Sequence, residues 1–417
     1  MMRALFAAVS GLRNHQARMD VIGNNIANVN TVGFKGSRVT FKEAFVQLLA
    51  GASRPTSSLG GVDPIQIGTG MSIGSIDQDF TQGSLEATGQ PLDMAIEGRD
   101  MFVVSDGQGQ AYTRAGNFQI DATGKLVAPA SGMVVQGITA DASGNLNPSS
   151  AVGNIVLNLG AKAPAQATST VTLTGNLDAN AAVGTTHQMG ITVYDSAGSA
   201  HDLQLTFTNT GPGAWSWTAS SGSATVTPAG SGTVTFNPNG SLASFTYPGG
   251  GANITLTPAT GAPFNVAINA GTVNGINGMV GFANPSNAVI SAQDGFAAGD
   301  LVNISVDSHG VISGFFTNGV TRSLAQVALA SFNNPSGLTD SGNNTWTESA
   351  NSGQAVVGFS GTTSASTIAP ASLETSNVDI SQEFTDMIIT QRGFQANARV
   401  ITTADEMLND IVNIIHQ

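Results

Sequence analysis

Apolar residues recur every seven positions at both ends of this chain, a spacing typical of a helix that packs along one seam against a partner. Lone helices are marginally stable in water, so such seams need a partner. We predict long assembly helices within residues 1–30 and 377–417; the alternative is a pair of ordinary amphipathic helices packed on one domain. The repeat falls on Leu5, Leu12, Met19 and Ile26, with Ile22 and Val29 on the neighbouring row, and on Ile380, Met387, Phe394, Ile401, Leu408 and Ile415.

The composition between these helices is typical of short strands joined by turns. Only 10% of the 417 residues are charged, and 51 are glycine. The net charge of −13, with 14 Lys and Arg in all, argues against a nucleic-acid partner, because phosphate binding needs clustered basic residues. No cysteine is present, which excludes disulfides, thiol nucleophiles and cysteine-ligated metals.

Charge differs between the two ends. Basic residues gather in the first 54 positions, whereas acidic residues predominate in the last helix. Opposite charges would let the two helices pair in an oriented way; the alternative is two separate, solvated faces. The basic residues are Arg3, Arg13, Arg18, Lys35, Arg38, Lys42 and Arg54, and the acidic ones are Asp379, Glu383, Asp386, Asp405, Glu406 and Asp410.

The N-terminal apolar run, residues 4–9, is too short for the core of a signal peptide, and the heptad continues past it. We therefore predict a retained N-terminus. Nothing elsewhere approaches the roughly 18 consecutive apolar residues of a transmembrane helix, so we predict no membrane insertion.

Glycine and asparagine mark the end of the first helix. The Asn-rich residues 24–30 disfavour a helix interior, and Gly33 and Gly36 release the chain into a connector. We predict an extended linker over 31–74, with a second short helix at 41–49. Asn377 is predicted to cap the last helix.

The remainder predicts two β domains. Strand-like alternation spans 75–144 and resumes over 291–376, and the nearly uncharged stretch 145–290 is predicted to be an inserted all-β sandwich or barrel domain. Asp-x-x-Gly sequences at 121–124, 141–144, 195–198 and 307–310 predict hairpin turns. The predicted fold is mainly β with terminal α-helices: a discontinuous coiled-coil domain from both termini, a β domain from two chain segments, and the inserted domain.

No motif points to catalysis, a cofactor or a metal. Residues 70–74 match a nucleophile-elbow pattern, but the following residues look like a strand rather than the required helix. The histidines lack zinc-ligand spacing, and His201 and His309 fit polar strand or turn positions. We predict that the chain is not an enzyme.

Four segments resemble the family of flagellar rod and hook proteins: MDVIGNNIANVNTVGFKG (19–36), GQPLDMAIEG (89–98), YTRAGNF (112–118) and ITQRGFQANAR (389–399). The resemblance covers about residues 1–140 and 365–417. It assigns the turn into the linker and the C-terminal helix motif to Asn24, Asn25, Ile26, Ala27, Asn28, Gly33, Phe34, Gln391, Arg392 and Gly393.

Within this family, the chain's length and inserted domain favour the hook over the rod. The resemblance implies a structural subunit that self-assembles into a curved helical tube, a flexible joint that transmits motor torque from rod to filament. It implies an extracellular location on the basal body and export without a cleaved signal. The implied partners are further copies, the distal rod protein, the hook cap protein, the hook-filament junction protein and the export apparatus.

Two alternatives stay open at this point. One is a distal rod protein of the basal body. The other is an adhesive, carbohydrate-binding β protein on a coiled-coil stalk, which requires exposed aromatic residues; Trp215 and Trp217 lie two apart on one predicted strand, and Trp346 is remote.

Overall fold

A computed structural model describes residues 2–55, 60–141, 144–158, 160 and 162–415, with side chains up to residue 411. The chain forms two compact units. Unit 1 contains Met1–Asn158, Ile304–Ser313 and Arg322–Gln417, and unit 2 contains Leu159–Asn303 and Gly314–Thr321. Unit 2 is therefore an insertion in unit 1. This arrangement confirms the predicted fold class: mainly β, with terminal helices, a β domain made from separate chain segments, and an inserted β domain.

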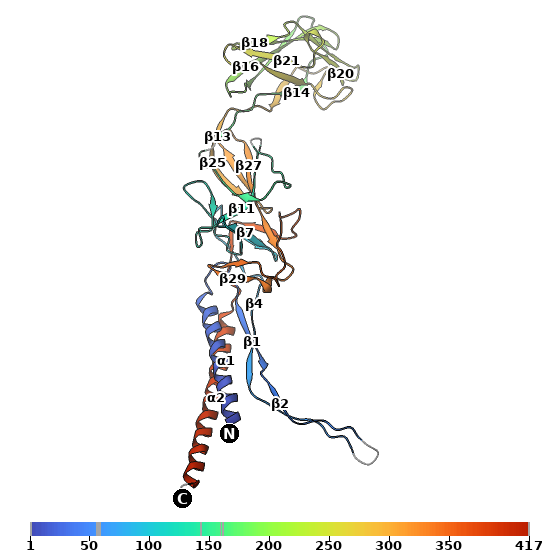
Figure 1. Cartoon of the computed structure of the whole chain (residues 1–417). Coiled ribbons are helices and arrows are strands. Elements are labelled where there is room, and N and C mark those ends of the chain that lie inside the picture. Colours follow the sequence, from blue (N-terminus) through green and yellow to red (C-terminus); the bar gives the residue numbers. More distant parts are fainter. Residues whose placement is uncertain (1, 56–59, 142–143, 159, 161, 416–417) are drawn as a thin grey trace. The chain divides into compact units, whose positions relative to one another are not determined.

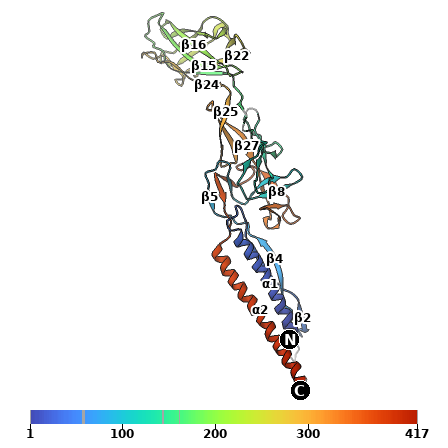
Figure 2. The same ribbon diagram turned by 90° about the vertical axis from the view of Figure 1, so that its left-hand side faces the viewer.

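The terminal helices α1 (Met2–Ala27) and α2 (Ile380–Ile415) lie side by side in unit 1 (Figures 1 and 2). Helix α2 begins after Asp379, whose Oδ1 accepts hydrogen bonds from the N–H groups of Ser381 (2.8 Å) and Gln382 (3.2 Å). A carboxylate here satisfies free helix N–H groups and complements the helix dipole. The predicted cap, Asn377, is wrong: its side chain instead joins Gly36 to the segment around Asp79.

No helix in the described part of the chain is both long enough and apolar enough to cross a membrane.

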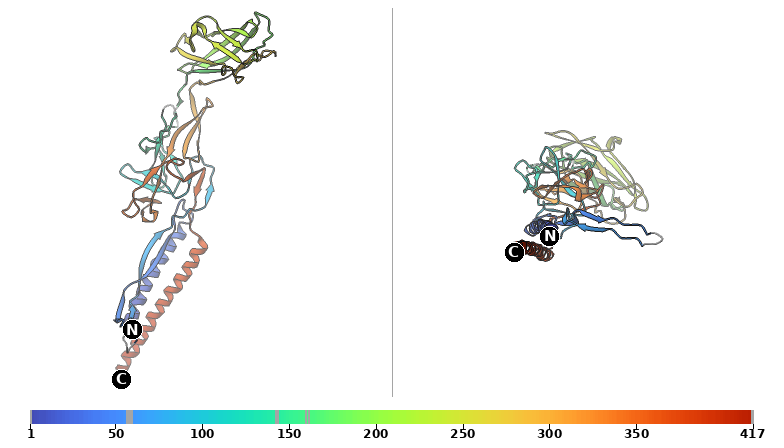
Figure 3. Two further views of the ribbon diagram at one scale, coloured as in Figure 1. Left: turned by 90° about the vertical axis from the view of Figure 1, so that its right-hand side faces the viewer. Right: turned by 60° about the horizontal axis from the view of Figure 1, so that its bottom comes forward.

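Two strand pairs follow α1. Strand β1 (Ser37–Glu43) pairs antiparallel with β4 (Met71–Gln78), and β2 (Val46–Ala50) pairs antiparallel with β3 (Ile65–Gly68). The predicted short helix at 41–49 is wrong, because β1 gains a full ladder with β4 and both strands contact α1. Such tertiary contacts override local periodicity. The β2–β3 hairpin projects away from the helix pair (Figure 3).

The β domain of unit 1 has two apolar clusters, one around Phe102 and Leu126 and the other around Tyr112 and Trp346. Its strands are β5 (Leu85–Ala87), β6 (Met94–Glu97), β7 (Met101–Ser105), β8 (Gln110–Thr113), β9 (Gln119–Ile120), β10 (Leu126–Val127), β11 (Val134–Thr139), β12 (Gly153–Asn154), β28 (Leu329–Ser331), β29 (Thr339–Gly342), β30 (Thr345–Thr347), β31 (Val356–Gly358), β32 (Thr367–Pro370) and β33 (Ser372–Glu374), with the 3₁₀ turn η2 (Pro335–Gly337).

In this domain, strands from the C-terminal part of the chain pair with strands from its N-terminal part. Strand β32 pairs with β6 and β33 pairs with β5, both antiparallel. Likewise β28 pairs with β7 and β30 with β8. The domain is thus closed only when residues up to Glu374 are in place.

Unit 2 is a sandwich of two sheets, ordered β18-β21-β22-β14-β23, with β24 beside β14, and β15-β16-β17-β19-β20. One apolar core lies between them, with Trp215, Trp217 and Phe207 among its members. The elements are β13 (Lys162–Ala163), β14 (Thr170–Asn176), β15 (Thr186–Tyr194), β16 (Ala200–Gly211), β17 (Ala214–Ser220), β18 (Ala224–Thr227), β19 (Gly232–Phe236), β20 (Leu242–Thr246), η1 (Pro248–Gly250), β21 (Ile254–Pro258), β22 (Phe264–Asn269), β23 (Met279–Val280) and β24 (Val289–Gln293).

The chain passes from unit 1 to unit 2 after Asn158, and the other three crossings lie within strands β25 (Gly299–Val306), β26 (Val311–Phe316) and β27 (Thr321–Val327).

The four predicted Asp-x-x-Gly turns are present. In each, the glycine N–H donates to the carbonyl of the aspartate three residues back, and the glycine has positive φ. The aspartate carboxylate also accepts backbone N–H groups of its own turn, as at Asp121 and Asp307. The turns at 121–124, 195–198 and 307–310 each connect two strands that pair with each other, β9 with β10, β15 with β16 and β25 with β26, which confirms them as hairpin corners. Residues 142–143 of the remaining turn lie outside the described residues.

Candidate functional site

The two terminal helices approach each other through glycine. A Cβ atom on Gly11 of α1 would lie 2.7 Å from the Asn397 side chain of α2, and a Cβ on Gly393 of α2 would lie 2.8 Å from the His15 ring of α1. The fit is therefore reciprocal, with one large side chain from each helix resting on a glycine of the other. The His15 ring also meets Phe41 of β1 edge-on, with centroids 5.8 Å apart.

Hydrogen bonds and an ion pair fix how α1 and α2 are aligned with each other. Asn25, which is buried, donates to Glu383 of α2 (2.9 Å) and exchanges hydrogen bonds with the Ser37 backbone at the start of β1. Arg18 of α1 and Asp386 of α2 form an ion pair at 3.2 Å. Both contacts join a residue of the first helix to an acidic residue of the last.

The heptad residues lie mostly beside this contact rather than at its centre. The buried face of α1 consists of Ala8, Gly11, Asn14, Ile22 and Asn25. Only Ile22 of the predicted set is buried there, and Ile380 is exposed. The half-buried members are Leu5, Leu12, Met19, Ile26, Met387, Phe394, Ile401 and Leu408. Ile415 lies in α2 beyond the described side chains, and the assembly role of the whole set stays a prediction.

The motif that follows α1 forms a tight turn. Asn28 donates to the carbonyl (3.0 Å) and side chain (2.9 Å) of Asn24 and accepts from Thr31. Gly33, at φ 68°, is buried so closely against Ala115 that a Cβ would lie 2.6 Å from its backbone nitrogen. Only glycine fits both constraints. Of the other motif residues, Ile26 and Phe34 are half-buried, and Ala27, Gln391 and Arg392 are exposed.

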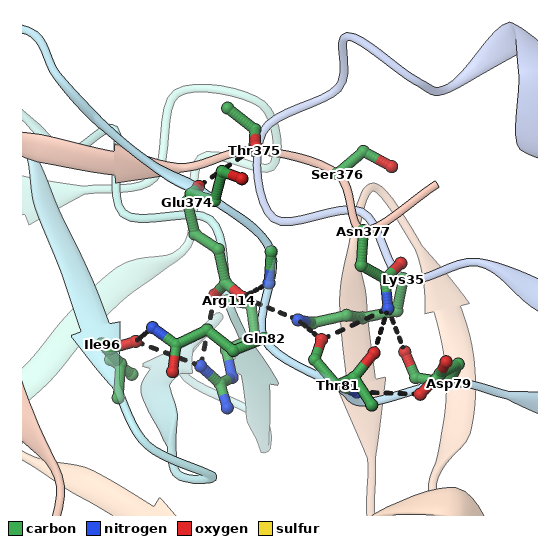
Figure 4. Close-up of polar contacts among 12 residues, drawn as sticks. Lys35, Asp79, Thr81, Gln82, Ile96, Arg114, Glu374, Thr375, Ser376 and Asn377 are labelled. Carbon is green, nitrogen blue, oxygen red and sulfur yellow. Dashed lines mark hydrogen bonds and ion pairs between the residues drawn. The ribbon is translucent and has the colours of Figure 1, made fainter. Parts of the chain in front are cut away.

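Beyond this turn, three charged side chains from distant parts of the chain meet in the interior of unit 1. Glu374 at the end of β33 binds Lys35 Nζ (2.7 Å) through Oε1 and Arg114 Nη1 (3.2 Å) through Oε2 (Figure 4). None of the three side chains is more than 1% exposed. We call Lys35, Arg114 and Glu374 the ionic latch.

Backbone groups complete the latch. Lys35 donates to the Thr81 carbonyl (2.7 Å), and Arg114 donates to the carbonyls of Gly98 and Ile96. The N–H of Gly83 donates to Glu374 Oε1 (2.9 Å). The latch thus joins the turn after α1, the strands of the β domain and the segment that leads into α2.

The latch has two cations and one anion. Burial lowers the pKa of Lys35 below its usual range, and the neighbouring Glu374 carboxylate opposes that shift. Burial likewise lowers the pKa of Arg114, opposed by Glu374 and then Asp100. The Glu374 carboxylate therefore offsets the desolvation of both cations, and its loss would leave them buried without an ion-pair partner.

Sequence reasoning missed the latch. Lys35, Arg114 and Glu374 are separated by up to 339 positions, and no local sequence pattern pairs any of them with another. The only available signal was that Lys35 and Arg114 fall inside two of the four recognised segments.

Exposed apolar residues gather on the elements near the chain ends. The β2–β3 hairpin exposes Phe45 (80%) and six further apolar side chains on its strands and flanks: Val46, Leu48, Leu49, Val62, Ile65 and Ile67. The helices expose Met2, Phe6, Val9, Ile380, Phe384, Ile388, Ile389, Val400, Met407 and Ile411. A two-stranded hairpin without a covered apolar face is marginal in water, and exposed apolar patches of this kind are typical of interaction sites.

The described residues lack the features expected of a carbohydrate-binding protein or a metal site. Trp215, Trp217 and Trp346 are all at most 2% exposed, so the described surface offers no tryptophan platform for a sugar. The described side chains contain no cluster of three or more potential metal ligands.

Four family models match the chain: "Flagella basal body rod protein" over residues 5–35, "Flagellar hook protein FlgE/F/G D1 domain" over 95–179, "Flagellar basal body protein FlaE D2 domain" over 158–296, and "Flagellar basal body rod FlgEFG protein C-terminal" over 369–414. The four matches follow the order of the helices and β domains.

Whole-chain relatives agree. The chain is 41% identical to the flagellar hook protein FlgE of Borreliella burgdorferi and 40% identical to that of Treponema pallidum, each over 99% of this chain and 100% of the relative. It is 32% identical to FlgE of Escherichia coli over 99% and 100% of the two chains. The crystal structure of Helicobacter pylori FlgE2 matches the fold with a TM-score of 0.50 at 15% identity, covering 70% of this chain and 100% of the other.

Proposed function

Because this chain belongs to the family of bacterial flagellar hook proteins and is a non-enzymatic structural subunit of the extracellular hook, we propose how its copies join. Copies pack through the exposed apolar faces of α1, α2 and the β2–β3 hairpin, forming the curved tube. Head-to-tail contacts that do not close into a ring generate such helical polymers.

The observation that supports this proposal most is the hairpin. Its seven exposed apolar residues make it unfavourable in water as an isolated element. Burying each such side chain in a neighbouring copy would contribute about 1.5–3 kcal/mol before ordering costs. The predicted heptad residues Leu5, Leu12, Met19, Ile26, Met387, Phe394, Ile401 and Leu408 are proposed to extend the same contact along the helices.

The latch gives the tube a route for torque. In each subunit, force applied to the helices passes through Lys35, Glu374 and Arg114 into the β domain of unit 1. Unit 2 has a single basic residue, Lys162, between positions 151 and 300. Weakly charged surfaces of this kind form few ionic ties between copies, which lets neighbours slide as the tube bends.

We assign the remaining partners by position in the flagellum. The distal rod protein would receive the first subunits, and the hook cap protein would cover the growing end. The junction protein would follow the last subunits, and the export apparatus would deliver each chain.

Polymerisation of the purified chain tests the proposal. Phe45→Ser with Leu48→Ser should leave the circular dichroism of the monomer unchanged and abolish filaments seen by electron microscopy. Val183→Ser removes an apolar side chain of unit 2 whose exposure (72%) lies between those of Phe45 (80%) and Leu48 (57%), and it serves as the matched control. Normal polymerisation of the hairpin variant would rule out the hairpin as an assembly contact.

A further inference from the structure

Unit 2 brings together an aspartate, a histidine and a serine that assembly does not use. Asp195 lies in the turn between β15 and β16, His201 lies on β16, and Ser223 directly precedes β18. His201 Nε2 is 3.3 Å from Asp195 Oδ2, and His201 Nδ1 is 2.9 Å from Ser223 Oγ. The three side chains form one hydrogen-bonded chain that ends at the surface.

The aspartate fixes which ring nitrogen holds the hydrogen. Burial raises the pKa of Asp195, but hydrogen bonds from the Ser199 N–H, His201 and the Ala197 N–H outweigh it, so the pKa lies below its usual range. An ionised carboxylate only accepts hydrogen bonds, so Nε2 of His201 donates to it. In the neutral ring Nδ1 is then the acceptor, and the Ser223 hydroxyl donates to it.

The three side chains become more exposed along this hydrogen-bonded chain, from Asp195 through His201 to Ser223. Asp195 and His201 are buried, at 1% and 7% exposed, whereas Ser223 is exposed. A buried base beside an exposed hydroxyl leaves the nucleophile accessible while its partners are held in place. Two open hollows, of about 490 and 540 Å³, are lined by residues adjacent to Ser223 in sequence, Gly222 in one and Ala224 in the other.

We propose that Ser223 is an activated nucleophile that accepts an acyl group from an activated ester or thioester. Ser223 Oγ attacks the carbonyl carbon, and its proton moves to His201 Nδ1. The bond between that carbon and the leaving oxygen or sulfur breaks, and the proton passes from His201 to the leaving group. The product is an ester on Ser223, a stoichiometric modification of the outer surface of unit 2.

Acetylation of the full-length protein by p-nitrophenyl acetate, read by peptide mass spectrometry, tests this assignment. Ser221 and Ser231 on the same segment have no histidine contact among the described hydrogen bonds and provide an internal comparison within the wild-type chain. Ser223 should react about 10²-fold faster than either, the lower end of what a general base contributes. Equal rates at the three serines would overturn the proposal without any variant.

Two histidine variants test whether the reactivity of Ser223 depends on His201. His201→Gln should reduce the rate at Ser223 to that of Ser231, whereas His187→Gln, which loses a bond to the Ala288 carbonyl in the same unit, should leave it unchanged. Asp195 is the ionisable group in contact with His201, and Phe264 of β22 packs 6.1 Å from the ring. Asp195→Asn, which removes the carboxylate that holds the ring in place, should therefore lower the rate at Ser223; an unchanged rate would remove Asp195 from the arrangement.

Discussion

Glu374 is the residue of the ionic latch that pairs with both of the others. Isolated surface ion pairs contribute at most about 1 kcal/mol, but removing one member of a buried pair leaves an uncompensated charge and costs about 3–5 kcal/mol. Glu374 has two such partners, Lys35 and Arg114, which makes it the most sensitive of the three.

We expect Glu374→Gln to destabilise unit 1 by about 3–5 kcal/mol. Asp77→Asn, which breaks the exposed Arg38–Asp77 pair at 3.9 Å in the same unit, should cost less than about 1 kcal/mol. Hydrogen exchange of the β6 and β7 amides measures unit 1 by itself. Equal losses in the two variants would show that the latch contributes no more than a surface pair.

His15 gives the helix contact a pH dependence. Burial, and then the Arg18 charge, lower the pKa of His15 below 6.5, and its Nδ1 is buried without a hydrogen-bond partner among the described residues. A lowered folded pKa means that the unfolded chain binds more protons. The stability contributed by neutral His15 is therefore present above pH 6.5 and is lost as the pH falls from 6.5 through the folded pKa.

The difference in unfolding free energy between wild type and His15→Gln isolates this effect. It should be constant above about pH 7.5 and should shrink as the pH falls through 6.5. If the difference stayed constant from pH 8 to pH 5, the pKa of His15 would be the same in the folded and the unfolded chain, and the prediction would be wrong.

At the level of elements, the helix pair depends on close approach at Gly11. A Leu at this position would push Asn397 and α2 outward, because a Cβ already lies 2.7 Å from that side chain. Gly23 of the same helix has nothing within 4 Å of its Cβ position and is the matched control. We expect Gly11→Leu to shorten or abolish hooks, and Gly23→Leu to assemble; the reverse order would place the essential contact elsewhere.

The sequence predicted the existence of both helices but not the face on which they meet. Heptad counting selects large apolar residues, whereas the intramolecular contact uses Gly11, Gly393, His15 and Asn397, which such a pattern ignores. The same limit explains the wrong helix at 41–49, where pairing with a strand some thirty residues away decides the conformation. Turns were predictable because Asp-x-x-Gly forms its bonds locally.

For the molecule as a whole, chain nesting was predictable and the latch was not. Changes of composition mark the inserted domain, since they persist over many residues. Charges buried by distant segments leave no such trace: Arg114 and Glu374 are 260 positions apart. The nesting also means that the β domain of unit 1 is complete only when its late strands, up to Glu374, have paired with its early ones.

Electron microscopy of basal bodies from a strain that lacks this protein tests its role as the hook subunit. We predict complete rods that end without a curved hook, and restoration of the hook when the wild-type chain is supplied. Intact hooked flagella in the deleted strain would contradict it, and missing or truncated rods would place the protein in the rod instead.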